Sequence, residues 1–406
     1  METKRLVSKQ RNFYLSNKTQ SHAFRMNALK KLYRTVQTHE DAIKEALKKD
    51  LHKSGGESYL TEIGVTLKEI RYLMKHLKKF MKTKRQKTEL SNFPAKSFIS
   101  PHPYGVSLIM SPWNYPIYLT LAPLAGAIAA GNTAVVKPSN YSQASSDIIE
   151  KMLEDSFNDE YIAVVKGGRE ENQDLLNQHF DYIFFTGSPT VGKIVMEKAS
   201  KHLTPISLEL GGKSPTIVSK DADIDLSAKR IIFGKLINVG QTCVAPDYIL
   251  AHASVHDQLI ESLKKYIVEF YTDDPLNHPD YGKIINQKHF NRLKGLIEGE
   301  NIVFGGKFNQ KTHQIEPTIL DHVKDDSPVM QEEIFGPILP ILTYETNDEA
   351  INFVRNRPHP LAFYLFTNSK NTIHAFLNQC QFGGGCINDT IMQVASDYLP
   401  FGGVGN

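Results

Sequence analysis

The stretch GVSLIMSPWNYPIYLTLAPLAGAIAAGNTAVV, residues 105–136, contains no charged residue. A run of about 20 apolar residues is long enough to cross a bilayer. Three prolines would break such a helix, however: Pro112, Pro116 and Pro123. The stretch divides instead into a strand, a turn of proline and asparagine, a helix of small residues and a second strand at 133–136. It predicts a buried β-α-β unit rather than a membrane span.

The alternation of strands and helices continues beyond this unit. Four strands with helical stretches between them are predicted, at 106–110, 133–137, 162–165 and 182–186. This order indicates an α/β fold with a Rossmann-like, doubly wound parallel sheet, in which ligands bind at the carboxyl ends of the strands. A second set of strands and helices runs from Asp247 to about Asn388 and predicts a second α/β domain. Amphipathic helices are expected across 1–82, and an extended arm follows them.

Composition places the chain among ordinary globular proteins. It has 406 residues, of which 41% are hydrophobic and 22% charged, and this length suits two or three domains. A net charge of +3 does not favour nucleic acid as a partner. Three cysteines make no disulfide framework, and the N-terminus has no apolar signal region. We therefore expect a cytoplasmic protein.

A glycine-rich turn follows the fourth strand. The stretch GSPTVGK at 187–193 resembles a phosphate-binding P-loop, but Ile194 has no hydroxyl for Mg²⁺, which argues against a nucleoside-triphosphate hydrolase. Backbone N–H groups at the start of the next helix would still suit a phosphate, such as the pyrophosphate of a dinucleotide. The alternative is that these glycines serve only helix packing, and the pattern alone does not separate the two.

Two further residues carry chemistry. Glu209 is an isolated carboxylate in an apolar strand that ends at a double glycine, and burial would raise its pKa towards the value of a general base. Cys243 follows Gly240-Gln241-Thr242, where backbone N–H groups would favour a thiolate nucleophile. A small buried hydrophobe is the alternative for the cysteine.

Together these residues carry a resemblance to the aldehyde dehydrogenase superfamily. Six motifs occur in family order from about residue 100 to the end: SPWNYP (111–116), KPS (137–139), FTGS (185–188), LELGGK (208–213), GQTC (240–243) and EIFGP (333–337). The short region before Cys243 resembles the class 3 branch, which includes fatty and aromatic aldehyde dehydrogenases and has bacterial members.

The resemblance implies NAD(P)-dependent oxidation of an aldehyde to a carboxylic acid. Cys243 would attack the aldehyde, while the amide of Asn114 and the Cys243 backbone N–H would stabilise the oxyanion. After hydride transfer, Glu209 would activate the water that hydrolyses the thioester. Relatives that transfer the acyl group to coenzyme A typically lack this glutamate, so a free acid is expected as the product.

The cofactor residues follow from the same resemblance. The positions expected to bind NAD or NADP are Lys137, Asn140, Gly187, Ser188, Gly192, Glu333 and Phe335. A share in the role of the base is the alternative for Glu333 in this branch. Many relatives carry glutamate where this chain has Asn140, and that carboxylate would repel a 2′-phosphate. We therefore expect NADP to be tolerated at least as well here as in relatives that carry the glutamate.

Domain boundaries are predicted on the same basis. Residues 1–82 and 101–209 would form the dinucleotide-binding domain and 210–388 the catalytic domain, with 83–100 and 389–406 as bridging or oligomerisation segments. A homodimer is expected. Family members usually continue for several tens of residues past Gly403, so the C-terminal segment is expected to be incomplete, which puts dimerisation and activity in question.

The substrate is less defined. By resemblance Tyr115, Ile391 and Val394 line an apolar tunnel for medium-chain aliphatic or aromatic aldehydes, although core positions are the alternative. No metal site is expected, because the histidines lack ligand spacing with the cysteines, and Cys380 and Cys386 are expected to be structural. Two rival functions stay open: a cysteine thioesterase or acyl transferase, and a non-catalytic homologue that acts as a binding or structural protein.

Overall fold

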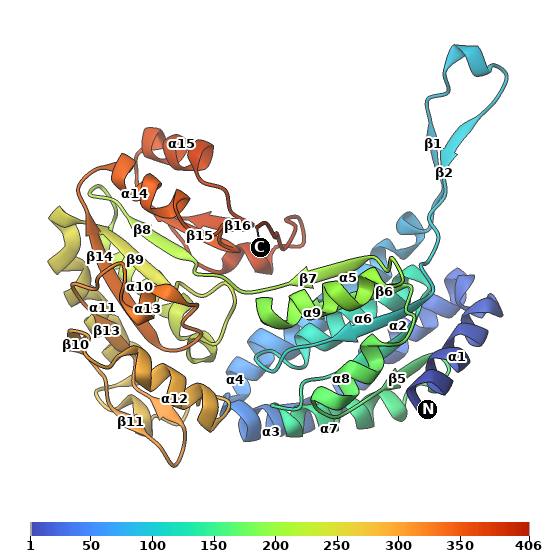
Figure 1. Cartoon of the computed structure of the whole chain (residues 1–406), viewed down its shortest axis with the longest axis horizontal. Helices are drawn as coiled ribbons and strands as arrows, with labels where there is room; N and C mark the ends of the chain where they lie inside the picture. Colours follow the sequence, from blue (N-terminus) through green and yellow to red (C-terminus); the bar gives the residue numbers. More distant parts are fainter. Residues whose placement is uncertain (1, 406) are drawn as a thin grey trace. The chain divides into compact units, whose positions relative to one another are not determined.

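A computed structural model describes residues 2–405, which form two compact units (Figure 1). The first unit contains the residues up to Leu47 together with Ser58–Glu209. The second contains Lys48–Glu57 and the residues from Leu210 onward. Residues 1 and 406, which fall in the predicted segments 1–82 and 389–406, lie outside the described part of the chain.

The first unit is built on a five-stranded parallel sheet of order β5-β4-β3-β6-β7. The strands are β3 (Val106–Met110), β4 (Thr133–Lys137), β5 (Ile162–Val164), β6 (Tyr182–Thr186) and β7 (Ile206–Glu209). Its longer helices are α1 (Glu2–Leu15), α2 (His22–Thr38), α3 (Glu40–Leu51), α5 (Gly64–Phe80), α6 (Tyr118–Ala130), α7 (Gln143–Glu154), α8 (Arg169–Leu176) and α9 (Pro189–Ser200). The predicted α/β alternation is confirmed.

The uncharged stretch forms β3, α6 and β4, as expected. Residues in β3 and β4 are buried along their whole length, which explains why both strands read as continuous apolar runs. One detail differs from the prediction, because Pro123 lies inside α6 and does not end it. The helix is buried through Leu121, Leu124 and Ile128, and this packing holds it together despite the missing N–H.

A short hairpin leaves the helical part of the first unit (Figure 1). Strands β1 (Lys84–Gln86) and β2 (Ser97–Ile99) pair antiparallel within the segment that was expected to be an extended arm. Leu90, Phe93 and Phe98 on this hairpin are mostly exposed. The short pieces α4 (Gly55–Ser58) and the π-helical turn η2 (Tyr59–Ile63) precede α5.

The second unit contains a seven-stranded mixed sheet of order β10-β13-β14-β9-β8-β15-β16. These strands are β8 (Pro215–Val218), β9 (Tyr248–His252), β10 (Ile302–Phe304), β13 (Thr318–Leu320), β14 (Ile338–Tyr344), β15 (Ala362–Phe366) and β16 (Gly384–Ile387), and β11 (Phe308–Asn309) pairs separately with β12 (Gln314–Ile315). Its helices are α10 (Ile224–Leu236), α11 (His256–Tyr271), α12 (Gln287–Leu296), α13 (Pro328–Gln331), α14 (Asn347–Arg355) and α15 (Lys370–Gln379).

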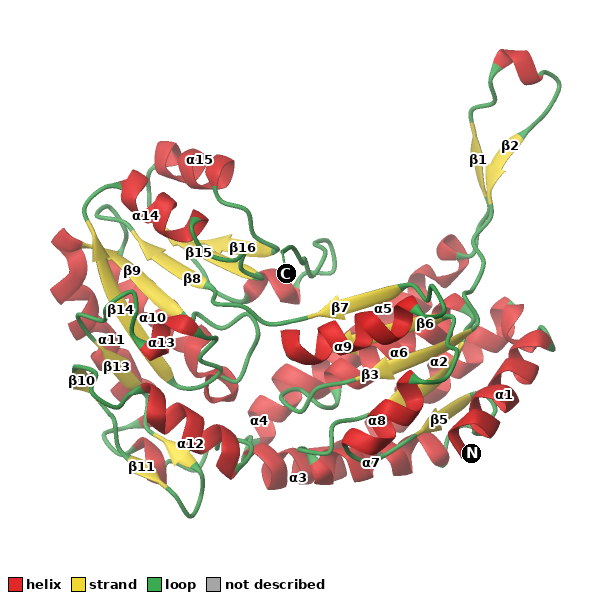
Figure 2. Cartoon of the chain, in the orientation of Figure 1, coloured by secondary structure: helices red, strands yellow, loops and turns green. Residues whose placement is uncertain are grey.

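Helices surround this second sheet (Figure 2), and two hydrophobic cores pack against it. One core joins the sheet to α12, α14 and α15 through Leu293, Ile351 and Phe376. The other joins it to α10 and α11 through Ile231 and Leu263. Cys243 is partly buried and packs against this second core.

Candidate active site

Cys243 lies in a turn between the short helix η4 (Ile237–Gly240) and β9, and it is half-buried and forms no disulfide within residues 2–405. Three consecutive residues before it have left-handed backbone: Asn238 (φ 51°), Val239 (φ 54°) and Gly240 (φ 74°). A β-branched residue such as Val239 rarely adopts this conformation, which costs about 1–3 kcal/mol. Backbone strain is therefore concentrated directly before the candidate nucleophile.

Gly240 is required at its position for two reasons. Its φ is positive, and a β-carbon there would lie 2.2 Å from the Gly336 carbonyl oxygen. The turn that carries Cys243 is thus packed against the segment that carries Glu333.

The buried side chain of Gln241 fixes the N-terminal side of the turn. Its amide donates to the carbonyls of Asn238 at 3.1 Å and Lys283 at 3.0 Å, and its Oε1 accepts from the Ile285 N–H at 3.1 Å. The Asn238 amide in turn donates to the Gln241 carbonyl at 3.1 Å. Since Gln241 is fully buried, these hydrogen bonds are shielded from water and hold the loop firmly.

Glu333 lies against the double glycine, Gly211-Gly212, of the LELGGK motif. A β-carbon on Gly211 would meet Oε2 of Glu333 at 2.0 Å, and the Gly212 backbone hydrogen-bonds the same carboxylate. Oε1 is buried and has no hydrogen-bond partner among the described residues. Burial, followed by the nearby charge of Asp247, raises the pKa of Glu333 to about 8. A buried carboxylate oxygen without a donor is suited to a hydroxyl from a ligand.

A network centred on Lys213 fixes the segment around Glu333. Lys213 forms an ion pair with Asp247 and donates to the carbonyls of Val329 at 2.8 Å and Glu332 at 2.9 Å. Asp247 also accepts from the Ile334 N–H at 2.8 Å. A second cation, Arg292, donates to the carbonyls of Glu333 and Ile334 at 3.2 and 2.6 Å. The sequence placed Lys213 in a motif, but the ion pair and hydrogen bonds that Lys213 forms here were not predicted. The contacts of Asp247 and Arg292 with the same segment were also missed.

In the first unit, candidate residues follow the carboxyl ends of neighbouring strands. Asn114 comes shortly after β3 and is 3% exposed, so its amide is almost wholly enclosed. Lys137 ends β4, and its ammonium donates to the carbonyls of Pro138 at 2.9 Å and Gly167 at 2.7 Å. Burial lowers the pKa of Lys137 to about 8. Asn140 is exposed three residues further on.

The turn after β6 carries the predicted anion site, which stays a prediction. The Gly187 N–H donates to the Glu209 carbonyl at 2.9 Å, and a β-carbon on Gly187 would collide with the ring of Phe185. Ser188 is exposed and caps the start of α9 without a side-chain hydrogen bond, while Gly192 is buried one turn inside the helix. The hydroxyl of Thr186 at the strand end is buried without a hydrogen-bond partner in the described chain. These groups are compatible with a dinucleotide.

Glu209 is the last residue of β7, the edge strand of the first sheet. Burial raises the pKa of its carboxyl to about 7. A carboxylate of this basicity accepts a proton from water more readily than an ordinary surface glutamate does. The role of Glu209 as general base stays a prediction, and the raised pKa of its carboxyl is consistent with that role.

The predicted substrate residues divide between the two units. Tyr115 is 8% exposed in the first unit. Ile391 and Val394 pack, partly buried, against the same core as Cys243 in the second. Ile391 has left-handed backbone with a φ of 54°, a further strained position in the Cys243 core. Phe335, predicted to contact the cofactor, is half-buried and also has a positive φ of 51°.

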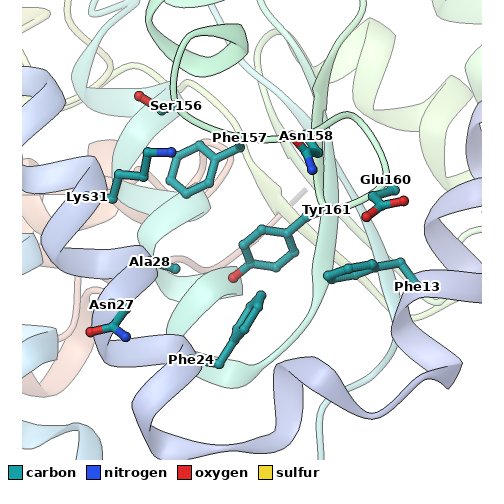
Figure 3. A pocket seen from close by; sticks show the side chains of 10 residues that line it. All are labelled: Phe13, Phe24, Asn27, Ala28, Lys31, Ser156, Phe157, Asn158, Glu160 and Tyr161. Carbon is teal, nitrogen blue, oxygen red and sulfur yellow. The ribbon is translucent and has the colours of Figure 1, made fainter.

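A cavity of about 310 Å³ lies elsewhere in the first unit (Figure 3). Its walls come from α1, α2 and the residues before β5, and they include the rings of Phe13, Phe24, Phe157 and Tyr161. None of the predicted catalytic or cofactor-binding residues lines it. This cavity is therefore separate from the candidate active site.

Residues 2–405 also bear on metal binding and on membrane insertion. No group of three or more His, Cys, Asp or Glu side chains in this range is placed to hold a metal ion. Within the same range, none of the helices combines the length and the apolar character needed to span a bilayer.

The fold and the family comparison define a class: an α/β oxidoreductase. The chain belongs to the aldehyde dehydrogenase family, whose sequence pattern matches residues 2–406. Members of this family use NAD or NADP, and the reaction of this chain is the NAD(P)-dependent oxidation of an aldehyde.

Individual relatives place it near the class 3 branch. The chain is similar to the "4,4'-diaponeurosporen-aldehyde dehydrogenase" of Staphylococcus aureus, with 51% identity over 395 residues that cover 97% of this chain and 86% of the relative. Similarity to rat "Aldehyde dehydrogenase family 3 member A2" is 44% over 401 residues, covering 99% and 83%. A solved structure of the substrate-bound state of Staphylococcus aureus AldH superimposes with a TM-score of 0.97 at 50% identity, covering 99% of this chain and 88% of that one.

Proposed function

We propose that Cys243 is the nucleophile of this aldehyde oxidation. Its thiolate attacks the aldehyde carbon and forms a thiohemiacetal, whose oxyanion accepts hydrogen bonds from the Asn114 amide and the Cys243 backbone N–H. When bound, NAD(P) accepts the hydride that leaves this carbon. The chain is then left with a thioester on Cys243.

Glu209 completes the reaction by hydrolysis. Its carboxylate takes a proton from the water that attacks the thioester, which releases the carboxylic acid and regenerates the thiolate. The observation that carries this assignment is the pKa of about 7 that burial gives Glu209, because a base of that strength is half ionised near neutrality. A cysteine thioesterase or acyl transferase is disfavoured by the family membership, and so is a non-catalytic homologue.

The cofactor would be held by residues near Glu333 at its nicotinamide end and by residues near Lys137 and Gly187 at its adenosine end. Glu333 offers its unpartnered Oε1 to a ribose hydroxyl, with Phe335 beside the nicotinamide. Lys137 and Asn140 serve the adenosine ribose, while Gly187, Ser188 and Gly192 lie along the adenosine and pyrophosphate. The absence of a carboxylate at Asn140 supports NADP as an alternative to NAD.

The substrate class that we propose is a medium-chain aliphatic or aromatic aldehyde. Tyr115, Ile391 and Val394 supply apolar surface that suits such a chain. The decisive experiment is steady-state oxidation of an aldehyde panel with NAD and with NADP, including 4,4'-diaponeurosporen-aldehyde, for the wild type and Cys243→Ala. Equal activity of the two proteins would overturn the mechanism, and loss of activity only in the variant supports it.

We further propose a cytoplasmic homodimer. The cysteine content supports a reducing compartment. The exposed Leu90, Phe93 and Phe98 of the hairpin support a partner subunit, because apolar side chains gathered at one surface favour association. Light scattering after gel filtration should give twice the mass of the chain, and a Leu90→Ser, Phe93→Ser double variant should shift the mass towards that of the monomer.

A further inference from the structure

Tyr364 lies on β15, next to the edge strand β16, and connects the second sheet to the nucleophile turn. It is fully buried in β15, and its hydroxyl donates to the Val244 carbonyl at 2.5 Å. Val244 directly follows Cys243. Burial raises the pKa of Tyr364 well above its usual range, so the hydroxyl stays protonated and remains a donor.

This hydrogen bond fixes one peptide plane at both ends. The Val244 carbonyl belongs to the same peptide as the Ala245 N–H, which donates to the Thr242 carbonyl at 3.0 Å. Cys243 therefore occupies the second position of a four-residue turn that is closed by one backbone hydrogen bond and braced from outside by Tyr364. Rotation of that peptide, which would turn the cysteine away, would break both interactions.

Tyr364 is itself held by the C-terminal part of the chain. Gln393, in the short helix η7 (Met392–Ala395), is 6% exposed and donates from its amide to the Tyr364 hydroxyl oxygen at 3.2 Å. The Cys386 thiol in β16 donates to Oε1 of the same amide at 3.0 Å. Burial raises the pKa of Cys386, which keeps this thiol protonated. The amide is thus oriented, with its oxygen towards Cys386 and its nitrogen towards Tyr364.

We propose that Tyr364 is a positioning residue for the reaction, and that the chain Cys386–Gln393–Tyr364–Val244 sets the orientation of the Cys243 turn. The inference rests on the proposed role of Cys243 as the nucleophile. It assigns a function to residues that carry no motif, and it gives Cys386 a role beyond packing.

Tyr364→Phe tests the proposal by removing a single oxygen atom. We expect kcat to fall about tenfold with KM for NAD within about twofold, since one shielded hydrogen bond is lost without a change in cofactor contacts. Alkylation of Cys243 by iodoacetamide, followed at the Cys243 peptide by mass spectrometry over a range of pH, should slow by a similar factor. A purely structural tyrosine would not change this rate.

Tyr344→Phe is the matched control. Tyr344 is a buried tyrosine of β14 in the same sheet, and its hydroxyl donates at 3.4 Å to the Val218 carbonyl and to Oγ of Ser219 rather than to the nucleophile turn. It should change the melting temperature without changing kcat or the alkylation rate. If Tyr364→Phe behaves in the same way, with kcat and alkylation within twofold of wild type, the proposal is wrong.

Substitutions at Cys386, the far end of this hydrogen-bond chain, provide a rescue test. Cys386→Ala removes the thiol donor and should lower kcat about threefold, whereas Cys386→Ser retains a donor and should stay close to wild type. Equal kcat values for these two variants would contradict the role given to Cys386. Cys243→Ala distinguishes failure of the proposed function from failure of the positioning role. If Cys243→Ala stays active, Cys243 is not the nucleophile. If Cys243→Ala is inactive and Tyr364→Phe is fully active, only the positioning role of Tyr364 is wrong.

Discussion

Gly211 faces the carboxylate of Glu333 so closely that a β-carbon on the glycine would lie 2.0 Å from Oε2. The adjacent Gly212 differs, because a β-carbon there would make only ordinary contacts, with the Leu361 nitrogen at 3.5 Å as the nearest atom. The two glycines of this motif are therefore in different surroundings, and only one of them requires the absence of a β-carbon. The first leaves space for a carboxylate, and the second does not.

Gly211→Ala should displace Glu333 and weaken cofactor binding. We expect KM for NAD to rise about tenfold, corresponding to roughly 1.4 kcal/mol, with a smaller effect on the KM of the aldehyde. Gly212→Ala serves as the control and should stay within about twofold of wild type. Steady-state kinetics with varied NAD measures both, and equal KM values for the two variants would contradict the assigned role of Glu333.

Glu209 predicts a pH dependence for thioester hydrolysis. Because burial raises its pKa to about 7, the ionised base increases as the pH rises through 7, and the hydrolytic rate should increase with it. Glu209→Gln should form the thioester once and then stall. Stopped-flow absorbance should therefore show a burst of about one reduced cofactor per active site, with steady turnover reduced by about two orders of magnitude or more. Full steady turnover in this variant would exclude the assigned role.

Glu333 predicts how the stability of the protein without cofactor depends on pH. Its folded pKa of about 8 lies above the unfolded value near 4.5, so the folded state binds this proton more tightly. The resulting stabilisation is complete below about pH 4.5 and is lost as the pH rises through 8.

Glu333→Gln carries no such proton. The difference in the free energy of unfolding, variant minus wild type, should therefore increase by about 1–3 kcal/mol as the pH rises from 5 to 9. Urea unfolding at several pH values measures this difference, and contributions from other groups such as Glu209 cancel because both proteins contain them. A constant difference across the range would mean that the Glu333 carboxyl titrates normally in the folded chain.

Strands β3 and β4 of the first sheet could be predicted closely because they are buried on both faces. Apolar runs such as Val106–Met110 and Thr133–Lys137 carry that burial in consecutive residues, so their bounds are visible locally. The prediction that Pro123 breaks a helix was wrong, because the tertiary packing of α6 outweighs the local preference of proline. Local patterns report propensity, and packing decides the remainder.

The support of the site was invisible for a related reason. Lys213 binds carbonyls at Val329 and Glu332, more than 100 residues away, and a backbone carbonyl has no side-chain signature. Tyr364 and Gln393 likewise look like ordinary core residues, and their hydroxyl and amide acquire meaning only where the fold brings them together. The strained backbone of Val239 could not be expected from a residue that avoids positive φ.

Asn140 makes the choice of cofactor testable. Its exposed side chain leaves the position after Lys137-Pro138-Ser139 without negative charge, whereas a carboxylate there would repel a 2′-phosphate. For the wild type we expect a ratio of kcat/KM for NAD over NADP below about a hundredfold, which is some 2.7 kcal/mol. Asn140→Glu should lower kcat/KM for NADP by about tenfold or more and leave the value for NAD within about threefold.

Asn140→Gln is the control for side-chain length, because it adds the same methylene without a charge. It should leave the NAD to NADP ratio close to that of wild type. An equal loss of NADP activity in the glutamine and glutamate variants would show that bulk, and not charge, determines the preference at this position. A wild-type ratio above a hundredfold would show that Asn140 does not relax selection against the 2′-phosphate, whatever the variants do.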